Sequence, residues 1–400
     1  MSASASSRRT PPHTARHSTL LLASLLLIAM NFRGPITGVG PVLAELQAAF
    51  SLSPATAGLL TTLPLLAFGV VSPFAASFAQ RFGLERALFA SLVLVACGVL
   101  LRSAGPVGSL FAGTAIIGIG IAIGNVLLPS LVKRDFPARV PGITATCALM
   151  MGIAAGVVSA AAVPLAGAVG WQLALGASVL LPLLACLAWS AQLSSRTAPA
   201  SGTADMPHGG PVWRSPLAWQ VTLFIGTNSL LFYVLIAWLP TILTEAGLSP
   251  TMAGSLHGAM QLAAAVPGLF LGPMIGRMKD QKAIAAVLSL LVGVGLVGFI
   301  VRPGFAMLWA TCVGFASGGA FILALIYMGL RTRSPQQAAA LSGMAQCVGY
   351  LLAAGGPTLA GLLHDRVGSW TAVLAAGVLL SGVMAVCGVL AGRPRTVGGG

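Results

Sequence analysis

Arg33 is the residue whose type and position are most informative about chemistry. It lies roughly 20 Å along an apolar run that begins near Leu20, at about 1.5 Å per residue. An arginine at bilayer depth costs at least about 2.5 kcal/mol, so such a side chain usually faces a polar cavity, a protein partner or an anion. In one interpretation the guanidinium binds a small ligand. In the other, neighbouring carbonyl oxygens neutralise it and it only fixes packing.

The backbone around Arg33 is predicted to be a broken helix. Pro35 lacks an N–H donor and interrupts the helical hydrogen-bond ladder. Gly34 precedes it, and Gly38 and Gly40 follow it. Interrupted helices of this kind surround substrate sites near the midplane of membrane transporters. The sequence therefore predicts that Arg33 lies at a break in the first spanning helix.

Further polar side chains stand inside apolar runs, where they are costly unless they are solvated or paired. We expect these side chains to line a cavity between two halves of the protein. In the first half they are Asn31, Arg33 and Asn125, and in the second Asn228, Tyr233, Trp238, His257, Gln261, Gln346 and Tyr350. The alternative is that each pair forms an interhelical hydrogen bond, worth about 0.6 kcal/mol on average, that only joins helices.

Spacing separates these candidates. His257 and Gln261 are four residues apart and share a helix face, and Gln346 and Tyr350 repeat that spacing. Asn228 and Tyr233, five residues apart, need not share a face. Because no carboxylate is expected inside a span, His257 is the candidate for carrying a coupled proton. The alternative is a neutral, hydrogen-bonded histidine.

Composition identifies a membrane protein that crosses the bilayer many times. Hydrophobic residues make up 57% of the 400 positions and charged residues 7%, against roughly 25% charged in soluble domains. A net charge of +14 would suit a nucleic-acid partner, but seventeen of the 21 basic residues fall in the termini and alternate loops. The opposite loops hold Arg102, Arg302 and Arg366. This asymmetry indicates topology rather than nucleic-acid binding, with both termini cytoplasmic in a bacterial inner membrane.

Twelve apolar stretches, six in each half, predict an all-α protein with twelve transmembrane helices in two pseudo-symmetric six-helix bundles. The stretches are 20–44, 54–78, 87–104, 107–131, 143–167, 171–193, 217–241, 250–275, 283–301, 304–330, 337–363 and 370–391. The predicted domains are a basic cytoplasmic arm over 1–18, bundles over 19–193 and 216–392, a polar linker over 194–215 and a tail over 393–400. We expect the arm to be flexible rather than a cleaved signal, since the run behind it is too long and carries Arg33.

The two halves also repeat in sequence. Leu52-Ser53-Pro54-x-x-Ala57-Gly58 returns as Leu248-Ser249-Pro250-x-x-Ala253-Gly254, and Arg81 returns as Arg277, both at an offset of 196. Serine at the N-cap followed by proline is common helix-start chemistry. The shared spacing of two matches favours duplication instead.

Three segments resemble a known family: Asn31-x-Arg33-Gly34-Pro35, Gly124-Asn125-Val126-Leu127-Leu128-Pro129 and Lys133-Arg134-Asp135-Phe136-Pro137. The six-plus-six plan is similar to the major facilitator superfamily, and the segments resemble its cyanate permease and 2-nitroimidazole exporter branch. The resemblance implies alternating access, in which two bundles rock around a central site.

In that superfamily the loop after the second helix usually reads Gly-x-x-x-Asp-Arg-x-Gly-x-x-Arg and contributes to a cytoplasmic gate. The corresponding positions here are Ala76, Gln80, Arg81, Gly83 and Arg86, and in the second half Gly272, Gly276, Arg277, Lys279 and Lys282. The acidic residue is missing from both loops. Glu85 or Asp280 is the candidate replacement.

Other site types find little support in the sequence. The six cysteines stand singly in apolar runs, and the dinucleotide-like Gly293-x-Gly295-x-x-Gly298 lies inside an apolar helix without a preceding strand. We expect no enzymatic activity, no metal and no cofactor. The motifs Gly120-x-x-x-Gly124, Gly152-x-x-x-Gly156 and Gly314-x-x-x-Gly318 are typical of closely packed helices.

Two functional hypotheses follow, with the lipid bilayer and a small-molecule substrate as partners of a monomer. The first is a secondary transporter of a small anionic or polar solute, cyanate-like or carboxylate-like, held by Arg33. The second is an exporter of neutral heteroaromatic compounds such as nitroimidazoles, with Trp238 and Tyr350 stacking the ring. A transporter-shaped sensor is a remote third.

Overall fold

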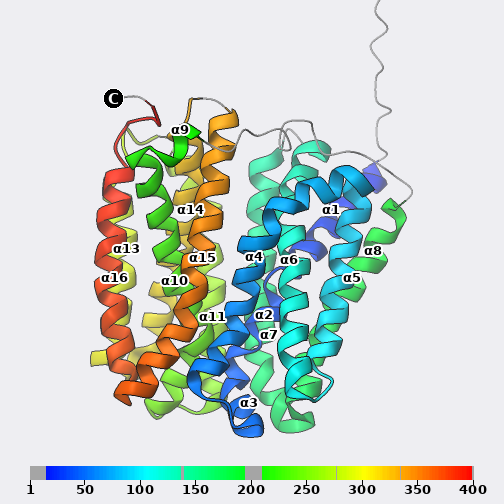
Figure 1. Cartoon of the computed structure of the whole chain (residues 1–400), viewed down its shortest axis with the longest axis vertical. Coiled ribbons are helices and arrows are strands. Elements are labelled where there is room, and N and C mark those ends of the chain that lie inside the picture. Colours follow the sequence, from blue (N-terminus) through cyan, green and yellow to red (C-terminus); the bar gives the residue numbers. More distant parts are fainter. Residues whose placement is uncertain (1–14, 137–138, 194–209, 276, 334, 399–400) are drawn as a thin grey trace, which may run out of the picture.

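A computed structural model describes residues 15–136, 139–193, 210–275, 277–333 and 335–398. Within these ranges every regular element is a helix (Figure 1). Most of the predicted arm and linker, residues 1–14 and 194–209, lies outside the described residues. The described end of the linker forms a single helical turn, α9 (Gly210–Trp213).

The first bundle follows the predicted spans closely. Its elements are α1 (Ala15–Met30), α2 (Gly34–Thr37), η1 (Gly40–Val42), α3 (Leu43–Phe50), α4 (Pro54–Phe82), α5 (Leu84–Arg102), α6 (Val107–Asp135), α7 (Val140–Gly176), η3 (Ala177–Val179), α8 (Leu180–Trp189) and η4 (Ser190–Gln192). Gly170, at a φ of 82°, kinks α7. A backbone in this region suits glycine, and the kink lies where the fifth and sixth apolar stretches were predicted to meet.

The second bundle repeats this arrangement. Its elements are α10 (Pro216–Glu245), α11 (Pro250–Ala265), η5 (Val266–Leu269), α12 (Leu271–Ile275), α13 (Lys282–Val301), η6 (Pro303–Phe305), α14 (Ala306–Leu330), α15 (Pro335–Val367) and α16 (Trp370–Ala391). Ten helical stretches of the described chain are long and apolar enough to cross a membrane, and one of them, Gly142–Gln192, contains two passes. The interrupted α11–α12 adds another, which agrees with the twelve predicted spans.

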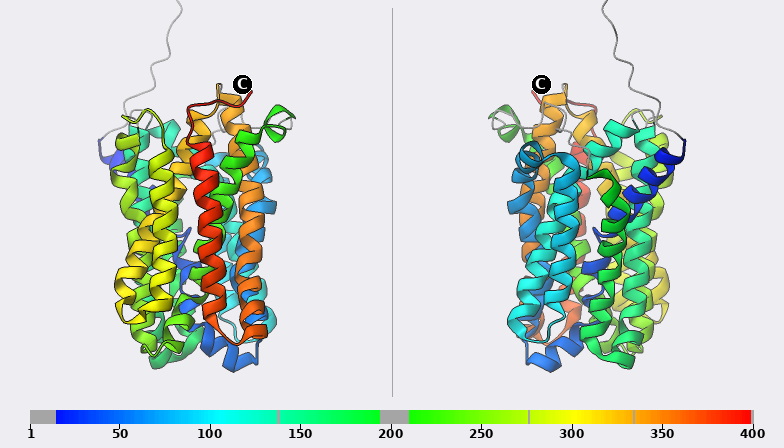
Figure 2. Two further views of the ribbon diagram at one scale, coloured as in Figure 1. Left: turned by 90° about the vertical axis from the view of Figure 1, so that its left-hand side faces the viewer. Right: turned by 90° about the vertical axis from the view of Figure 1, so that its right-hand side faces the viewer.

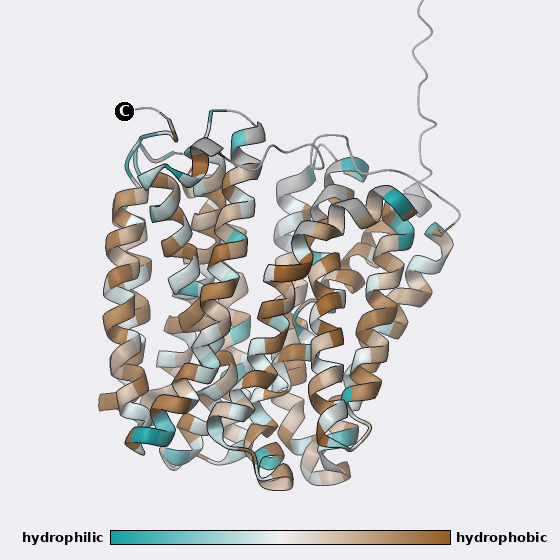
Figure 3. Ribbon diagram, in the orientation of Figure 1, coloured by the Kyte–Doolittle hydropathy of each residue, from teal (hydrophilic) through white to brown (hydrophobic). Residues whose placement is uncertain are grey.

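The two bundles stand side by side with their helices roughly parallel to one long axis (Figures 1 and 2). We call the end where α1 begins and α16 ends the terminal face, and the end that carries α3 the distal face. Apolar residues dominate the middle of the helices, and hydrophilic residues gather toward both faces (Figure 3). Large apolar side chains such as Leu379 and Val386 are exposed there, as expected for a surface that faces lipid.

The repeated motif has the same structure in both halves. Ser53 Oγ accepts a hydrogen bond from the Thr56 N–H at 3.2 Å, and Ser249 Oγ accepts one from the Met252 N–H at 3.3 Å. Each serine is the N-cap of its helix, α4 or α11, with a proline just inside. The motif thus starts the two helices that contact the opposite bundle most extensively, since α4 packs on α15 and α11 packs on α7.

The glycine that ends each repeat lies at the boundary between the bundles. A Cβ on Gly58 would lie 2.8 Å from the carbonyl oxygen of Pro357 on α15. A Cβ on Gly254 would lie 3.4 Å from the carbonyl oxygen of Ser159 on α7. The repeat therefore does more than start a helix, because it also allows backbone from one bundle to approach the other.

Hydrogen bonds between the bundles run from the middle of the helices to the distal face. Thr62 Oγ1 donates to the carbonyl oxygen of Ala354 at 2.7 Å, and the Ala55 N–H donates to Asp365 at 3.4 Å. Within the second bundle, backbone of α11 fills the space left by Gly314 and Gly318 of α14. The predicted small-residue motif is confirmed as a helix contact.

Candidate functional site

The first span is broken at Arg33, as the sequence predicts. Helix α1 ends at Met30, and Arg33, at φ −128° and ψ −41°, is the N-cap of α2. The Arg33 carbonyl oxygen accepts hydrogen bonds from the N–H groups of Ile36 and Thr37, each at 3.1 Å. Pro35 stands in the first turn of α2, where its missing N–H costs nothing. The chain therefore re-enters a helix directly after Arg33.

Asn31 stabilises the other side of the break. Its Nδ2 donates to the carbonyl oxygen of Leu27 at 2.8 Å, which satisfies an acceptor in the last turn of α1. Its Oδ1 is buried and has no partner among the described residues. The structure thus gives Asn31 a capping function and leaves one acceptor free.

Two of the family-like segments meet at this turn. A Cβ on Gly124 of α6 would overlap the ring of Phe32, so only glycine leaves room for that ring. Asn125, the next residue, is half-buried. Glycine in the second segment therefore fixes the position of the first, and with it the position of Arg33.

A buried arginine holds the turn from behind. Arg102, at the end of α5, donates from Nη1 to the carbonyl oxygen of Pro35 at 2.5 Å. Its Nη2 reaches the carbonyl oxygen of Leu175 and the hydroxyl of Ser178, each at 3.4 Å. The prediction that Arg102 lies in a loop was wrong about its environment, because the side chain is fully buried and its two Nη atoms donate to carbonyl and hydroxyl oxygens.

The Arg33 guanidinium faces aromatic rings of the second bundle. Its Cζ lies 5.2 Å from the ring centroid of Phe232 on α10, within the range of a cation–π interaction. The hydroxyls of Tyr233 on α10 and Tyr350 on α15 lie within electrostatic range of this charge. The Tyr350 ring packs edge-on against Phe68 of α4, with centroids 5.6 Å apart. Helices α10 and α15 of the second bundle thus place aromatic residues near this cation.

Arg33 has no carboxylate within ion-pair distance among the residues that the structure describes. The four described ion pairs lie elsewhere and involve Arg134, Lys282 and His364. The side chain is half-buried, so it is neither fully solvated nor enclosed. A cation in this position attracts an anion or a strongly polar oxygen.

Two of the predicted ligand residues are occupied with packing. Asn228 is buried, and its Nδ2 donates to the carbonyl oxygen of Ser317 at 3.1 Å. Trp238 is also buried; its Nε1 donates to the Pro357 carbonyl oxygen at 2.8 Å, and its ring packs against Trp370. The prediction that Trp238 stacks on a substrate is not supported in this conformation, because its ring belongs to a helix interface.

His257 and Gln261 both lie buried on α11, as their spacing predicts. The hydroxyl of Ser159 on α7 lies 2.6 Å from His257 Nδ1, so the histidine joins the two bundles. His257 Nε2 and both polar atoms of Gln261 have no partner among the described residues. The bond to Ser159 agrees with the interpretation of His257 as a hydrogen-bonded residue, and its Nε2 has no partner among the described residues.

The second polar pair, on α15, is more open. Gln346 and Tyr350 are both half-buried, and Gln346 Nε2 donates to Ser342 Oγ at 2.8 Å within the same helix. Tyr233 on α10 is half-buried as well. Gln346, Tyr350 and Tyr233 therefore each keep part of their side chain accessible.

The two acidic residues that could replace the missing aspartate of the gate loops, Glu85 and Asp280, each form an ion pair within their own bundle. Glu85 is buried at the start of α5 and accepts from Arg134 Nη1 at 2.5 Å within its own bundle. The expectation of no carboxylate inside a span was therefore wrong, because Glu85 belongs to the span Leu84–Arg102. Asp280 pairs with Lys282 at 3.2 Å, and the Lys282 hydrogen bonds lower the pKa of the Asp280 carboxyl. Each acid thus has a partner in its own half.

The basic residues of these loops point outward. Arg86, Arg277 and Lys279 are exposed, and the Arg81 guanidinium lies over the Phe82 ring. Gly83, at a φ of 90°, makes the turn from α4 to α5. The side chains of Gln80 and Lys133 lie outside the described part of the chain.

Comparison with known proteins identifies the family. A model of the Major Facilitator Superfamily matches residues 21–354. The chain belongs to this superfamily. It is 49% identical to the 2-nitroimidazole transporter of Escherichia coli (strain K12) over 385 residues, 96% of this chain and 98% of that protein. It is 32% identical to the cyanate transport protein CynX of the same organism, covering 88% of this chain and 91% of that protein.

The fold agrees with this assignment. A crystal structure of a D-xylose-proton symporter matches with a TM-score of 0.74 and 14% sequence identity, over 96% of this chain and 99% of that one. The similarity at this identity concerns the fold alone. The Arg33–Phe232 contact lies at the boundary between the two bundles of this fold.

Proposed function

We propose that this transporter carries a small planar solute that bears a carboxylate or nitro group on a ring, by alternating access around Arg33. The observation that carries the proposal is the half-buried guanidinium of the first bundle, 5.2 Å from the Phe232 ring of the second. A substrate bound there touches both bundles at once, which is what a rocking mechanism requires.

The guanidinium selects the polar end of the solute. Carboxylate and nitro groups each hold two oxygens in one plane, and the planar fork of arginine donates two parallel hydrogen bonds to such a pair. One binding mode therefore covers both the anionic hypothesis and the nitroimidazole hypothesis. The 2-nitroimidazole transporter, 49% identical, is named for a solute of this shape.

The aromatic surroundings select the ring. The Phe232 ring beside the guanidinium suits a planar solute, and Tyr233 and Tyr350, within electrostatic range of the same charge, would add rings and hydroxyl groups. Cyanate is linear and has no ring to stack, so these side chains would contribute little to its binding. The geometry therefore favours a ring compound over a cyanate-like ion.

We further propose a bacterial inner membrane location with both termini cytoplasmic, so that the terminal face is the cytoplasmic face. The excess of arginine and lysine in the loops of that face supports this orientation. The protein is proposed to act as a monomer that transports without chemical conversion. His257 is the proposed site of proton coupling, supported by its buried Nε2, which has no hydrogen-bond partner among the described residues.

Binding and flux measurements on purified protein test the proposal. Benzoate and 2-nitroimidazole are expected to raise the melting temperature and to be transported in proteoliposomes, whereas cyanate binds weakly. Losing one arm of the fork in Arg33→Lys removes about 1.5–3 kcal/mol, roughly a 10- to 150-fold loss of affinity. Arg302→Lys, in an exposed loop, is the control. Wild-type affinity in Arg33→Lys, or cyanate binding that exceeds benzoate binding, would overturn the proposal.

A further inference from the structure

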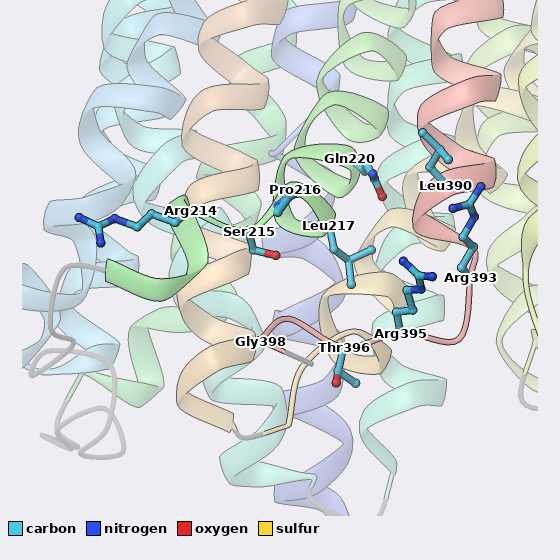
Figure 4. A pocket seen from close by; sticks show the side chains of 10 residues that line it. All are labelled: Arg214, Ser215, Pro216, Leu217, Gln220, Leu390, Arg393, Arg395, Thr396 and Gly398. Carbon is cyan, nitrogen blue, oxygen red and sulfur yellow. The ribbon is translucent and has the colours of Figure 1, made fainter. Parts of the chain in front are cut away.

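A basic hollow lies on the terminal face of the second bundle, away from Arg33. Its volume is about 450 Å³, and it lies between the start of α10, the end of α16 and the tail (Figure 4). Arg214, Arg393 and Arg395 are among its lining residues, together with Gln220 and Leu390, and none of the described lining residues is acidic. The hollow therefore has unbalanced positive charge.

Two of the arginines belong to a tail that is folded against the bundle. The Val397 N–H donates to the Arg331 carbonyl oxygen at 2.8 Å, and the Val397 side chain is buried. Arg333 Nε donates to Thr396 Oγ1 at 2.9 Å. These contacts fix the backbone of the segment that carries Arg393 and Arg395. Both arginines therefore extend from a folded part of the chain.

The arginine side chains are not equivalent. Arg393 and Arg395 lie near each other beside Leu390, with Gln220 of α10 close by, whereas Arg214 extends away from them (Figure 4). A ligand with one negative group is therefore bound mainly by Arg393 and Arg395, with the amide of Gln220 as a further polar contact.

An exposed apolar strip leads along α16 to this hollow. Leu379, Val383 and Val386 are 76%, 49% and 61% exposed, and Leu390 continues the same helix face into the hollow. Where α9 leads into α10, the exposed rings of Trp213 and Trp219 pack edge to face, with centroids 6.0 Å apart. Tryptophan is typical of the level at which lipid headgroups meet the hydrocarbon.

We infer that the hollow binds an anionic phospholipid, with its phosphate on Arg393 and Arg395 and its acyl chains along the α16 strip. Arginine pairs strongly with phosphate oxygens, and the headgroup level marked by the tryptophans is where that phosphate lies. A free phosphate ion would use the arginines but not the apolar strip. The strip is therefore the observation that favours a lipid.

Native mass spectrometry of the full-length protein tests the site with phosphatidylglycerol and phosphatidylcholine of identical acyl chains. Phosphatidylglycerol is expected to be retained preferentially. The double variant Arg393→Gln/Arg395→Gln is expected to bind it roughly 30-fold more weakly, at about 1 kcal/mol per arginine. The control Arg139→Gln/Arg366→Gln removes the same charge from two exposed positions and is expected to keep wild-type binding.

A second variant and an inorganic phosphate arm separate the possible ligands. Val386→Asn is expected to weaken phosphatidylglycerol binding while it leaves the arginines intact. Displacement of the lipid by millimolar inorganic phosphate, with no effect of Val386→Asn, would assign the hollow to free phosphate and overturn the lipid site. Equal retention of both lipids, or equal losses in the double variant and its control, would overturn it as well.

Discussion

Arg102 on α5 donates a 2.5 Å hydrogen bond to the carbonyl oxygen of Pro35, two residues beyond Arg33. The two arginines therefore differ in kind. Arg102 is fully buried and surrounded by oxygens of its own bundle, whereas Arg33 is half-buried and faces the rings of the other bundle. The fully buried Arg102 holds the turn that presents the half-buried Arg33.

Arg102→Met is expected to destabilise the first bundle and to weaken substrate binding. The change leaves the Pro35 carbonyl oxygen buried without its donor, at a cost of about 1–3 kcal/mol. Thermal unfolding in detergent and amide hydrogen exchange of the segment after Arg33 measure these effects. Arg102→Lys, which keeps one donor, is expected to recover part of both. Unchanged exchange in Arg102→Met would refute the positioning role, whatever the substrate is.

Ser159→Ala is expected to favour opening of the distal face. It removes the hydrogen bonds of Ser159 with His257 and with the Gly254 carbonyl oxygen, both of which join α7 to α11. One such bond is worth about 0.5–1.5 kcal/mol, roughly a 2- to 12-fold shift in the equilibrium. Distances between spin labels on the distal ends of α4 and α15 measure the shift. Ser255→Ala is the control, because among the described residues that hydroxyl donates to the Thr251 carbonyl oxygen of its own helix, α11. Equal distance distributions in both variants would contradict the prediction.

His257→Gln tests proton coupling separately. If His257 carries the proton, the variant is expected to lose the stimulation of transport by a pH gradient while it keeps exchange of substrate across the membrane, because exchange needs no net proton movement. Parallel flux and exchange measurements in proteoliposomes distinguish the two. Gradient-driven transport that survives the substitution would exclude His257 as the carrier.

Gly58→Val is expected to prevent full closure of the distal face. The added Cβ would lie 2.8 Å from the Pro357 carbonyl oxygen and 2.9 Å from the Thr358 Cα, and backbone atoms cannot move aside as flexible side chains do. Spin-label distances across α4 and α15 should lengthen, and transport should fall. Gly343→Val on α15, where the Cβ meets no atom within 4 Å, serves as the control. A closed distal face in Gly58→Val would refute this contact as a requirement.

The Glu85–Arg134 pair is expected to stabilise the first bundle by about 1–2 kcal/mol, less than a fully enclosed pair, because Arg134 retains solvent contact. Glu85→Gln and Arg134→Gln should each lower the melting temperature, and the double variant should lose less than their sum. Asp280→Asn removes an exposed pair with Lys282 and should change nothing measurable. Additive losses at positions 85 and 134 would contradict the coupling.

The sequence predicted the helices well because membrane crossing imposes a length and a composition. The predicted start at residue 54 and the predicted break at Arg33 are both present, and Gly170 divides the fifth and sixth passes where the apolar stretches separate. Each of these signals is local in the chain. A proline, a glycine or a run of apolar residues acts on its own helix, so no knowledge of neighbours was needed.

The site was harder to predict because it depends on which helices meet. Periodicity placed His257 and Gln261 on one face but could not show that this face packs on α7. The sequence suggests Trp238 as a substrate-binding residue, because its contacts with Trp370 and Pro357 on other helices cannot be derived from the sequence. Arg102 gave no signal in the sequence, since an arginine at the end of a span normally reaches water. Phe232 was also missed, because a phenylalanine in an apolar run looks like any other lipid-facing or core residue.

The close approach of Gly58 and Gly254 to the opposite bundle determines what kind of force holds the distal face together. Contacts of this sort depend on fit and dispersion, which dissolved ions hardly screen. Apart from the contribution of the exposed Asp365 carboxylate, the free energy of closing the distal face should therefore change little with salt concentration. An organism that meets changing salinity would keep the same balance between the two orientations of its transporter.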